Sequence, residues 1–226
     1  MPISSEKIFI IIPAFNEAER VGQVITGLFE HGFKNIVVVD DGSTDHTIQI
    51  AKYVGAIVIA HVINRGQGAA LETGDEYARQ QEAEAVVHFD GDGQFNAADI
   101  TVALKKLEQN QADVVLGSRF LDTRTTMPWF KRKVIFPLGK WINFFLTGVR
   151  LTDVHNGFRV LSRTALEKIH ITQDRMAHNS EIVALIKKNK FSYVEIPVEV
   201  TYHEYGQGIG GGLRILKEWV VHLMTQ

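Results

Sequence analysis

Two carboxylates separated by one glycine form the most chemically suggestive motif of the chain. Asp90 and Asp92 follow an apolar run, and Gly91 between them allows both side chains to face one ion. Oxygen ligands of this kind suit Mg²⁺ or Mn²⁺, which often bridge protein carboxylates to substrate phosphates. Gln94 is placed to help as an amide ligand or by ordering a metal-bound water. The alternative is a polar turn that only caps the next helix, so the triplet taken alone is a weak signal.

A second acidic segment, residues 40–45, also ends an apolar run. The carboxylates of Asp40 and Asp41 are suited to accept hydrogen bonds from a nucleobase or from ribose hydroxyls. An unpaired buried carboxylate is costly, so Asp40 needs a partner, which a bound base would supply. Ser43 or Thr44 is equally suited to cap the following helix, and we expect both roles to coexist.

Residues 13–17, beginning with Pro13, follow the first apolar run and offer an aromatic face and a carboxylate. Phe15 suits stacking on a planar group, and Glu17 suits sugar hydroxyls. The alternative is that Phe15 belongs to the core and that Glu17 begins a helix at its favourable, positively polarised end.

Two arginines are placed to meet phosphate. Arg65 lies in residues 64–68, just before a helical pattern, where backbone amides and a guanidinium suit a diphosphate. A plain flexible loop is the alternative for this segment. Arg119 ends another apolar run, and its planar guanidinium can bind two phosphate oxygens at once. The alternative for Arg119 is a surface ion pair, for example with Asp122.

The first half of the chain predicts a scaffold that brings these segments together. Short β-branched runs alternate with helical patterns, which indicates an α/β fold with a Rossmann-like, mostly parallel central sheet covered by helices on both faces. Ligands of such sheets bind beyond the carboxyl ends of the strands, so the polar segments should share one edge. The expected strands are 8–12, 35–40, 56–61, 85–90 and 113–117, and the expected helices are 18–31, 44–54, 68–79 and 97–109.

The second half of the chain is less regular. Residues 128–146 combine bulky apolar groups with four basic residues, as an interfacial membrane segment does; an amphipathic flap packed on the core is the alternative. A helix is expected over 180–190, a strand over 193–202 and a helix over 213–224. The glycines of 206–211 match a dinucleotide fingerprint, but too few residues follow for its second strand. A mobile lid over a substrate is the better interpretation.

Composition bounds the class of protein. The chain has 226 residues, 45% of them hydrophobic, which is enough for one substantial core, so we expect a single domain. A formal net charge of -2 indicates that the molecule as a whole does not bind polyanions such as nucleic acid, and a local basic patch is the alternative left open. The absence of cysteine excludes disulfides and cysteine-ligated zinc. No signal-peptide pattern or stretch of roughly 20 apolar residues is present, so we expect a cytoplasmic protein, soluble or peripheral at the inner face of the cell membrane.

Taken together, these segments resemble the family 2 glycosyltransferases of the GT-A fold. The matching motifs are residues 12–17 (IPAFNE), 39–45 (VDDGSTD), 64–68 (NRGQG), 90–94 (DGDGQ) and 117–119 (GSR). Each is weak alone, but the ordered set is highly specific. Residues 153–159 (DVHNGFR) look like the Asp-x-x-Ser-Gly-Phe-Arg stretch of the polyprenyl-phosphate branch, typified by dolichyl-phosphate mannose synthases. Asn156 stands in place of the more usual serine.

The resemblance implies an inverting transfer of a sugar from a UDP- or GDP-sugar to an undecaprenyl- or dolichyl-type polyprenyl phosphate in cell envelope biogenesis. Residues 1–120 would form the donor half of one domain and residues 121–226 its acceptor half. The donor nucleotide would be held by Pro13, Phe15, Glu17, Asp40, Asp41, Arg65, Gly68, Asp90 and Gly91. Magnesium or manganese would be held by Asp90, Asp92 and Gln94. The acceptor would be faced by Arg119, Arg132, Asn156, Arg159 and His203, and catalysis would involve Asp92, Asp153, Arg119 and Arg132.

Two departures from this branch bear on the acceptor. Many relatives carry C-terminal membrane spans, which this sequence lacks, so the chain would need a separate membrane protein partner or act at the bilayer surface. Residues 202–212 also lack the usual Arg-x-x-Gly-x-Ser-Lys pattern. We expect His203, Tyr205 and Gln207 to do that work differently.

Three alternatives stand beside this interpretation. A glycan hydroxyl acceptor would need a general base, for which Asp153 and Glu181 are candidates, whereas an ionised phosphate needs none. A sugar-phosphate nucleotidyltransferase would carry a Gly-x-Gly-Thr-Arg-rich stretch where residues 13–17 stand. A non-catalytic nucleotide-sugar binder is disfavoured because Asp90 and Asp92 are present together with Gln94. The sequence does not predict the oligomeric state.

Overall fold

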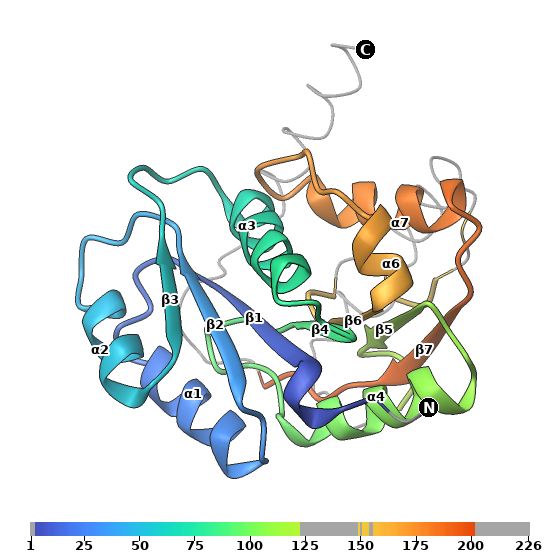
Figure 1. Ribbon diagram of the computed structural model, residues 1–226, viewed down its shortest axis with the longest axis horizontal. Helices are drawn as coiled ribbons and strands as arrows, with labels where there is room; N and C mark the ends of the chain where they lie inside the picture. The colour runs from blue at the N-terminus through green and yellow to red at the C-terminus, as the bar shows by residue number, and fades with distance from the viewer. Residues whose placement is uncertain (1–2, 123–148, 150, 154–155, 202–226) are drawn as a thin grey trace.

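A seven-stranded sheet, in the order β3-β2-β1-β4-β6-β5-β7, forms the centre of the computed structural model (Figure 1). The structure describes residues 3–122, 149, 151–153 and 156–201. The strands are β1 (Ile8–Ala14), β2 (Asn35–Asp40), β3 (Ile57–Ala60), β4 (Ala85–His88), β5 (Val114–Ser118), β6 (Arg159–Ser162) and β7 (Tyr193–Pro197). The helices are η1 (Ser5–Lys7), α1 (Val21–Glu30), α2 (Thr47–Val54), α3 (Gln67–Gln80), α4 (Ala98–Gln109), α6 (Arg163–Lys168) and α7 (His178–Lys188).

The sheet is mostly parallel, as predicted, with one reversed strand. β2 and β4 flank β1 in parallel, β3 pairs in parallel with β2, and β7 pairs in parallel with β5. β6 runs antiparallel between β4 and β5, where Val160 lies opposite both Val87 and Val115. The segments that follow β1, β2, β4 and β5 therefore leave the sheet at the same edge, which is where such sheets bind ligands.

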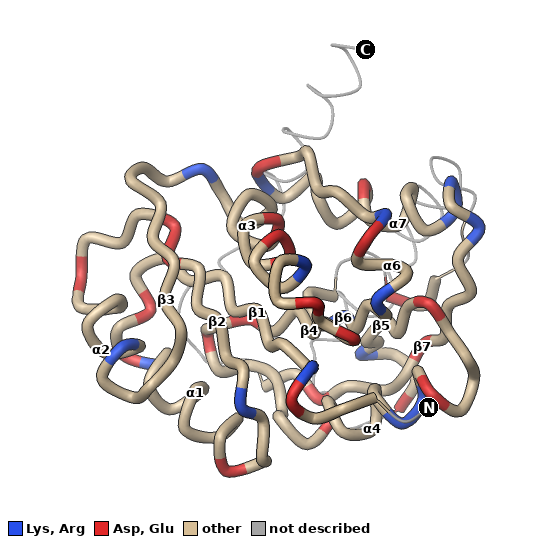
Figure 2. The backbone as a smooth tube through the Cα atoms, viewed as in Figure 1, with Lys and Arg blue, Asp and Glu red and all other residues tan. Residues whose placement is uncertain are grey.

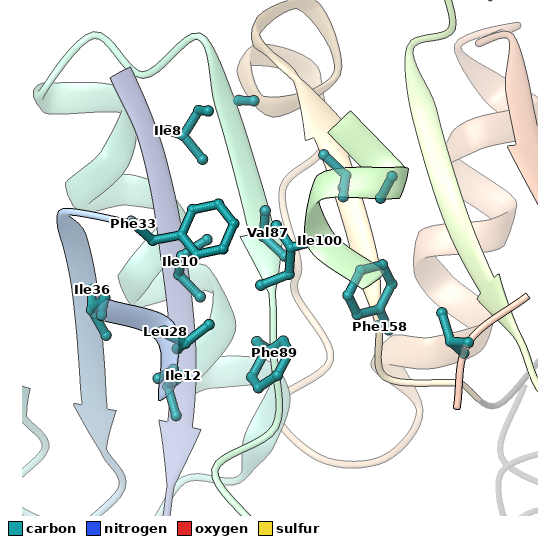
Figure 3. Packing of buried hydrophobic residues seen from close by; sticks show 14 of the residues in the cluster. Ile8, Ile10, Ile12, Leu28, Phe33, Ile36, Val87, Phe89, Ile100 and Phe158 are labelled. Atoms are coloured by element: carbon teal, nitrogen blue, oxygen red, sulfur yellow. The ribbon is translucent and has the colours of Figure 1, made fainter. Parts of the chain in front are cut away.

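Both faces of β1 are buried, which explains its uninterrupted apolar sequence. Successive side chains of a strand point to opposite faces. Ile8, Ile10 and Ile12 pack in a cluster with residues of α1, α2 and α4, part of which Figure 3 shows. Phe9 and Ile11 pack in a second cluster with residues of α3, α6 and α7. The predicted arrangement of helices on both faces of the sheet is confirmed (Figure 1).

Three short elements, η1, β6 and α6, lie outside the set that the sequence predicts. β6 is a four-residue strand that includes a buried arginine, Arg159, so it lacks the longer β-branched run of the other strands. α6 follows at once, and the side chain of its N-cap Ser162 accepts a hydrogen bond from the amide of Ala165, as N-cap residues do. The strand expected over 193–202 ends earlier, at Pro197, although the amide of Val198 still donates to the carbonyl of Ser118 at 3.0 Å.

Helices α1 and α2 begin three residues later than predicted, at Val21 and Thr47. The side chain of Asp45 lies beside both helix starts, where it accepts hydrogen bonds from the amides of Ala18 (3.2 Å) and Thr47 (3.0 Å). Asp45, rather than Ser43 or Thr44, therefore accepts the hydrogen bond from the first amide of α2.

Acidic and basic residues are interspersed along the described backbone (Figure 2). Among the described helices, none joins the length to the apolarity that a membrane span requires. Several predicted features lie outside the described residues: Arg132, His203, the segment 128–146, the glycine-rich loop 206–212 and the helix 213–224.

Candidate functional site

A cavity of about 390 Å³ opens at the carboxyl edge of the sheet. Its walls come from the end of β1 and the residues after it, from the segments after β2, β4, β5 and β7, from α3 and from the residues before β6 and α7. The predicted site residues that line it are Pro13, Phe15, Glu17, Asp41, Asp90, Gly91, Asp92, Gln94, Arg119 and Asn156. Residues as distant in sequence as Pro13 and Asn156 thus meet in one hollow.

The Asp90 carboxylate is fixed from two sides. Gln67 Nε2 donates a hydrogen bond to Asp90 Oδ1 at 2.8 Å. On the other side lies Gly157, where an added methyl group would overlap the carboxylate. Burial raises the pKa of Asp90 to about 6, and the nearby charge of Asp92 adds to the rise. Gly157 therefore leaves free the space that this carboxylate fills.

Glu17 brings a third carboxylate to the cavity. Burial raises the pKa of Glu17, and repulsion from Asp92 raises it further. Glu17 Oε2 accepts no hydrogen bond within the described part of the chain, although it lies 3.6 Å from Arg20 Nη1. Asp92 Oδ1 accepts the amide of Gln94 at 3.0 Å. The negative charge gathered here favours a ligand that carries a cation or hydrogen-bond donors.

The donor set of Asp90, Asp92 and Gln94 fits a divalent cation shared with a substrate. Within the described ranges, no three His, Cys, Asp or Glu side chains form a metal cage of their own. Mg²⁺ does not require such a cage, because it usually keeps several waters and binds one or two carboxylates plus phosphates. A cation held by these carboxylates would offset their mutual repulsion, which adds to the effect of burial on the pKa of Asp90.

Asp40 closes its own turn and does not line the cavity. It is fully buried, and its Oδ2 accepts the amide of Ser43 at 2.9 Å. Asp40 Oδ1 has no hydrogen-bond partner among the described residues. Asn16 joins this turn to the segment after β1, because its amide donates to Ser43 Oγ and its Oδ1 accepts the amide of Thr44, both at 2.9 Å. The two loops are thus locked together beside the cavity.

Asp41 lines the cavity and fixes the loop between β3 and α3. Its Oδ1 accepts hydrogen bonds from His61 Nδ1 at 2.7 Å and from the amide of Arg65 at 2.9 Å. Its Oδ2 accepts the amide of Gly66 at 2.6 Å. These bonds hold the loop to the end of β2.

The structure does not bring Arg65 and Gly68 to the cavity wall. The Arg65 guanidinium pairs with Asp174 Oδ1 at 3.2 Å, and the amide of Ala69 donates to the Asp174 carbonyl at 3.1 Å. Gly68 packs so closely on the carbonyl of Gln173 that no side chain would fit there. The segment before α7 thus occupies the start of α3, where the sequence pattern predicts a diphosphate.

Arg119 is oriented by Asp153, which lies behind the cavity wall. Asp153 is buried, and it accepts hydrogen bonds from Arg119 Nε (2.6 Å), Nη2 (2.7 Å) and backbone N (3.1 Å). Asn156 Nδ2 also donates to Asp153, at 3.3 Å. Both carboxylate oxygens of Asp153 are therefore engaged, and the structure makes this candidate base an anchor for Arg119.

Arg159 lies beneath the cavity rather than at its surface. It is 2% exposed, because β6 is enclosed by β4 and β5, where Arg159 stands opposite His88. It donates to Asn179 Oδ1, whereas its Nη1 has no partner in the described ranges. Burial lowers the pKa of Arg159 to about 10, against the attraction of Asp90. Arg159 does not line the cavity, so the structure does not place it where the sequence predicts contact with an acceptor.

Three lining residues matter although the sequence pattern does not single them out: Gln67, Gly157 and Met176. Gln67 and Gly157 stand inside motifs whose other members are predicted site residues, so proximity in sequence was the available signal. Met176 precedes α7, and no pattern marks it.

Comparisons with known proteins show the family and the fold of this chain. The profile of Glycosyl transferase family 2 matches residues 9–170, well over half of the chain, so the chain belongs to this family. It is 31% identical over 233 aligned residues to a UDP-N-acetylglucosamine--dolichyl-phosphate N-acetylglucosaminyltransferase of Methanococcus voltae, covering 94% of this chain and 93% of the relative. It is 30% identical to a polyprenol monophosphomannose synthase of Mycolicibacterium smegmatis, covering 89% of this chain and 80% of the relative.

A solved structure of similar fold is glucosyl-3-phosphoglycerate synthase from Mycobacterium tuberculosis in complex with Mn²⁺ and uridine-diphosphate-glucose. Its TM-score is 0.72 at 17% identity, and the match covers 97% of this chain and 78% of that one. The likeness establishes a GT-A-like fold for this chain.

Proposed function

We propose that this chain transfers a sugar, with inversion, from a UDP- or GDP-sugar to a polyprenyl phosphate, with Mg²⁺ or Mn²⁺ bound at the diphosphate. The observation that carries the proposal is the meeting of Asp90, Asp92 and Gln94 with Arg119 in one cavity. The carboxylates and the amide suit a cation, and the guanidinium suits a separate anion. The named activities of the Methanococcus and Mycolicibacterium relatives support a polyprenyl-phosphate acceptor.

The donor side of the cavity offers partners for a nucleoside and a sugar. Phe15 is 46% exposed and presents a ring for stacking. Glu17 Oε2, which lines the cavity, is a buried acceptor without a hydrogen bond in the described part of the chain, so a donor on a sugar suits it. A bound cation would stabilise the negative charge that develops on the leaving diphosphate.

The state of the two candidate bases supports a phosphate acceptor over a hydroxyl acceptor. Asp153 is held by Arg119 through both oxygens. Glu181 accepts the amides of Thr172 at 3.1 Å and Gln173 at 2.9 Å, one on each oxygen, and it does not line the cavity. An ionised phosphate oxygen can attack the anomeric carbon without a base. Arg119 would hold that phosphate in place for an attack opposite the departing diphosphate.

Exposed apolar side chains at this edge support a peripheral position at the inner face of a membrane. Val62 and Ile63, in the loop between β3 and α3, are 98% and 69% exposed. The loop is fixed by Asp41, so these side chains are presented to solvent by a tethered backbone. Phe15 and Met176, which line the cavity, are also exposed. A bilayer that held the polyprenyl chain would cover such side chains while the phosphate entered the cavity.

A vesicle experiment tests this position. Replacing both Val62 and Ile63 with serine should weaken binding to anionic phospholipid vesicles by about a hundredfold or more, since full burial of each branched side chain contributes roughly 1.5–3 kcal/mol and each 1.4 kcal/mol is a factor of about ten. The control is Tyr53→Ser, which removes another apolar side chain, 92% exposed, near the end of α2. Flotation should separate the two variants. Equal flotation of the double variant and the wild type would exclude this loop as a membrane contact.

The proposed reaction is tested with labelled donors. The wild-type chain, incubated with Mn²⁺, polyprenyl phosphate and radiolabelled UDP- or GDP-sugars, should place label in the organic phase with one of them. Label in a water-soluble glycan would point to a hydroxyl acceptor instead. Formation of pyrophosphate from a nucleoside triphosphate and a sugar phosphate would identify a nucleotidyltransferase.

A further inference from the structure

Glu195 of β7 is the acceptor on which a turn behind the cavity depends. Its Oε1 accepts hydrogen bonds from the amide of Thr152 (2.8 Å) and from Thr152 Oγ1 (2.7 Å), with a longer contact to the amide of Asp153 (3.4 Å). Glu195 is half-buried and does not line the cavity. A carboxylate serves this position because it only accepts hydrogen bonds and has lone pairs for several donors.

A chain of hydroxyl groups connects Glu195 to the end of β5. Thr152 Oγ1 lies 2.6 Å from Ser118 Oγ, and Ser118 Oγ accepts the amide of Phe120 at 3.2 Å. A hydroxyl has one proton to donate, and Thr152 donates its proton to Glu195. Ser118 must therefore donate to Thr152. Each hydroxyl group in the series donates toward Glu195, and the carboxylate is the final acceptor.

Arg119 stands between the two ends of this network. Ser118 and Phe120, its neighbours in sequence, are held by the hydroxyl chain. Its own amide and guanidinium are held by Asp153, whose amide faces Glu195. The groups that hold the backbone and the side chain of Arg119 are thus both hydrogen-bonded to the Glu195 carboxylate. Glu195 lies on β7, which pairs in parallel with β5.

We propose that Glu195 is a positioning residue that sets the Arg119 guanidinium for the acceptor phosphate. The inference rests on the proposed function, because it assigns Arg119 to the acceptor. Loss of Glu195 removes the acceptor at the end of the hydroxyl chain and frees the turn that carries Asp153. Arg119 then keeps its charge but loses its fixed direction, so binding of the acceptor weakens while binding of the donor does not change.

The test compares Glu195→Ala with Glu195→Gln. The alanine variant should raise the KM for a short-chain polyprenyl phosphate on the order of tenfold, the usual cost of stranding such hydrogen-bond donors. Its affinity for the UDP- or GDP-sugar that the wild type uses should stay within about twofold. Glutamine retains an oxygen acceptor and should restore most of the acceptor affinity. Glu167→Ala, which removes an exposed carboxylate from α6, is the matched control.

A double-mutant cycle with Arg119→Lys separates positioning from general destabilisation. If Glu195 acts through Arg119, Glu195→Ala should have little further effect on the acceptor KM once Arg119 is lysine. Full additivity, or equal losses of donor and acceptor affinity, would overturn the inference. Where Glu195→Ala does not fold, Thr152→Val interrupts the hydroxyl chain and should give the same acceptor defect. A wild-type chain that transfers no sugar to polyprenyl phosphate would instead refute the proposed function itself.

Discussion

Replacement of Asp92 by alanine is expected to abolish most sugar transfer while leaving the fold intact. A bound cation contributes several kcal/mol of charge stabilisation in the transition state, and each 1.4 kcal/mol is a factor of about ten in rate. Losing one of two carboxylate ligands should therefore lower kcat by at least about a hundredfold. The measurement is turnover with labelled donor at saturating Mn²⁺.

The stability of the same variant provides an independent check. Asp92 raises the pKa of both Glu17 and Asp90, which means that its charge is repelled by theirs in the metal-free chain. Relief of this repulsion offsets the loss of the hydrogen bond from the amide of Gln94, so Asp92→Ala should melt close to the wild-type temperature. The control Glu30→Ala removes an exposed carboxylate at the end of α1 and should change neither quantity.

Removal of the metal should reproduce the defect of Asp92→Ala. Chelation with EDTA is expected to stop transfer by the wild type, and added Mn²⁺ or Mg²⁺ is expected to restore it. Unchanged turnover in Asp92→Ala, or transfer that persists in EDTA, would contradict the role assigned to the carboxylates.

The sequence predicted those parts of the fold that are encoded locally. β1 contains five successive apolar residues, from Ile8 to Ile12, because both of its faces are covered. Such runs, separated by helical patterns, suffice to predict a mostly parallel sheet. β6 was not predicted because its burial depends on its neighbours. Arg159 is polar, yet it is enclosed between β4 and β5. Nothing in its own four residues indicates an antiparallel strand.

The sequence predicted correctly the place of the candidate site residues that directly follow a buried strand. Asp90, Asp92 and Arg119 follow buried strands, and the topology of the sheet brings them together. Arg65 and Gly68 were placed at a diphosphate because they precede a helix. Their surroundings are set by the segment before α7, about a hundred residues later in the chain, and such a tertiary contact has no local signal.

A buried polar layer beneath the cavity joins the elements that form it. His88 Nε2 on β4 lies 2.9 Å from Asp75 Oδ1 on α3, and Arg159 on β6 donates to Asn179 on α7. All four side chains are buried. Leaving a buried polar group without its hydrogen-bond partner costs about 1–3 kcal/mol, so small displacements of these elements are resisted. We infer that the layer keeps the floor under Asp90 rigid.

Gly157→Ala tests whether turnover depends on the position of the Asp90 carboxylate, against which Gly157 packs. The glycine needs no left-handed backbone, so its only obstacle to a side chain is space, and an added methyl group would overlap the Asp90 carboxylate. We expect the variant to fold, with a loss of about 1–3 kcal/mol from overpacking. Since misplacement by about 1 Å can cost a hundredfold in rate, kcat should fall by about that factor, and the Mn²⁺ concentration for half-maximal activity should rise.

The matched control for Gly157→Ala is Gly27→Ala in α1. No atom lies within 4 Å of a side chain added at Gly27, and alanine in a helix is more favourable than glycine by about 0.5–1 kcal/mol. This control should therefore melt slightly higher than the wild type and retain full activity. Full activity and normal Mn²⁺ dependence in Gly157→Ala would mean that Asp90 tolerates displacement, and Asp92 with Gln94 would then be the more important ligands. A defect in Gly157→Ala but not in Gly27→Ala would show that turnover depends on the position of the Asp90 carboxylate, because glycine itself contributes no functional group.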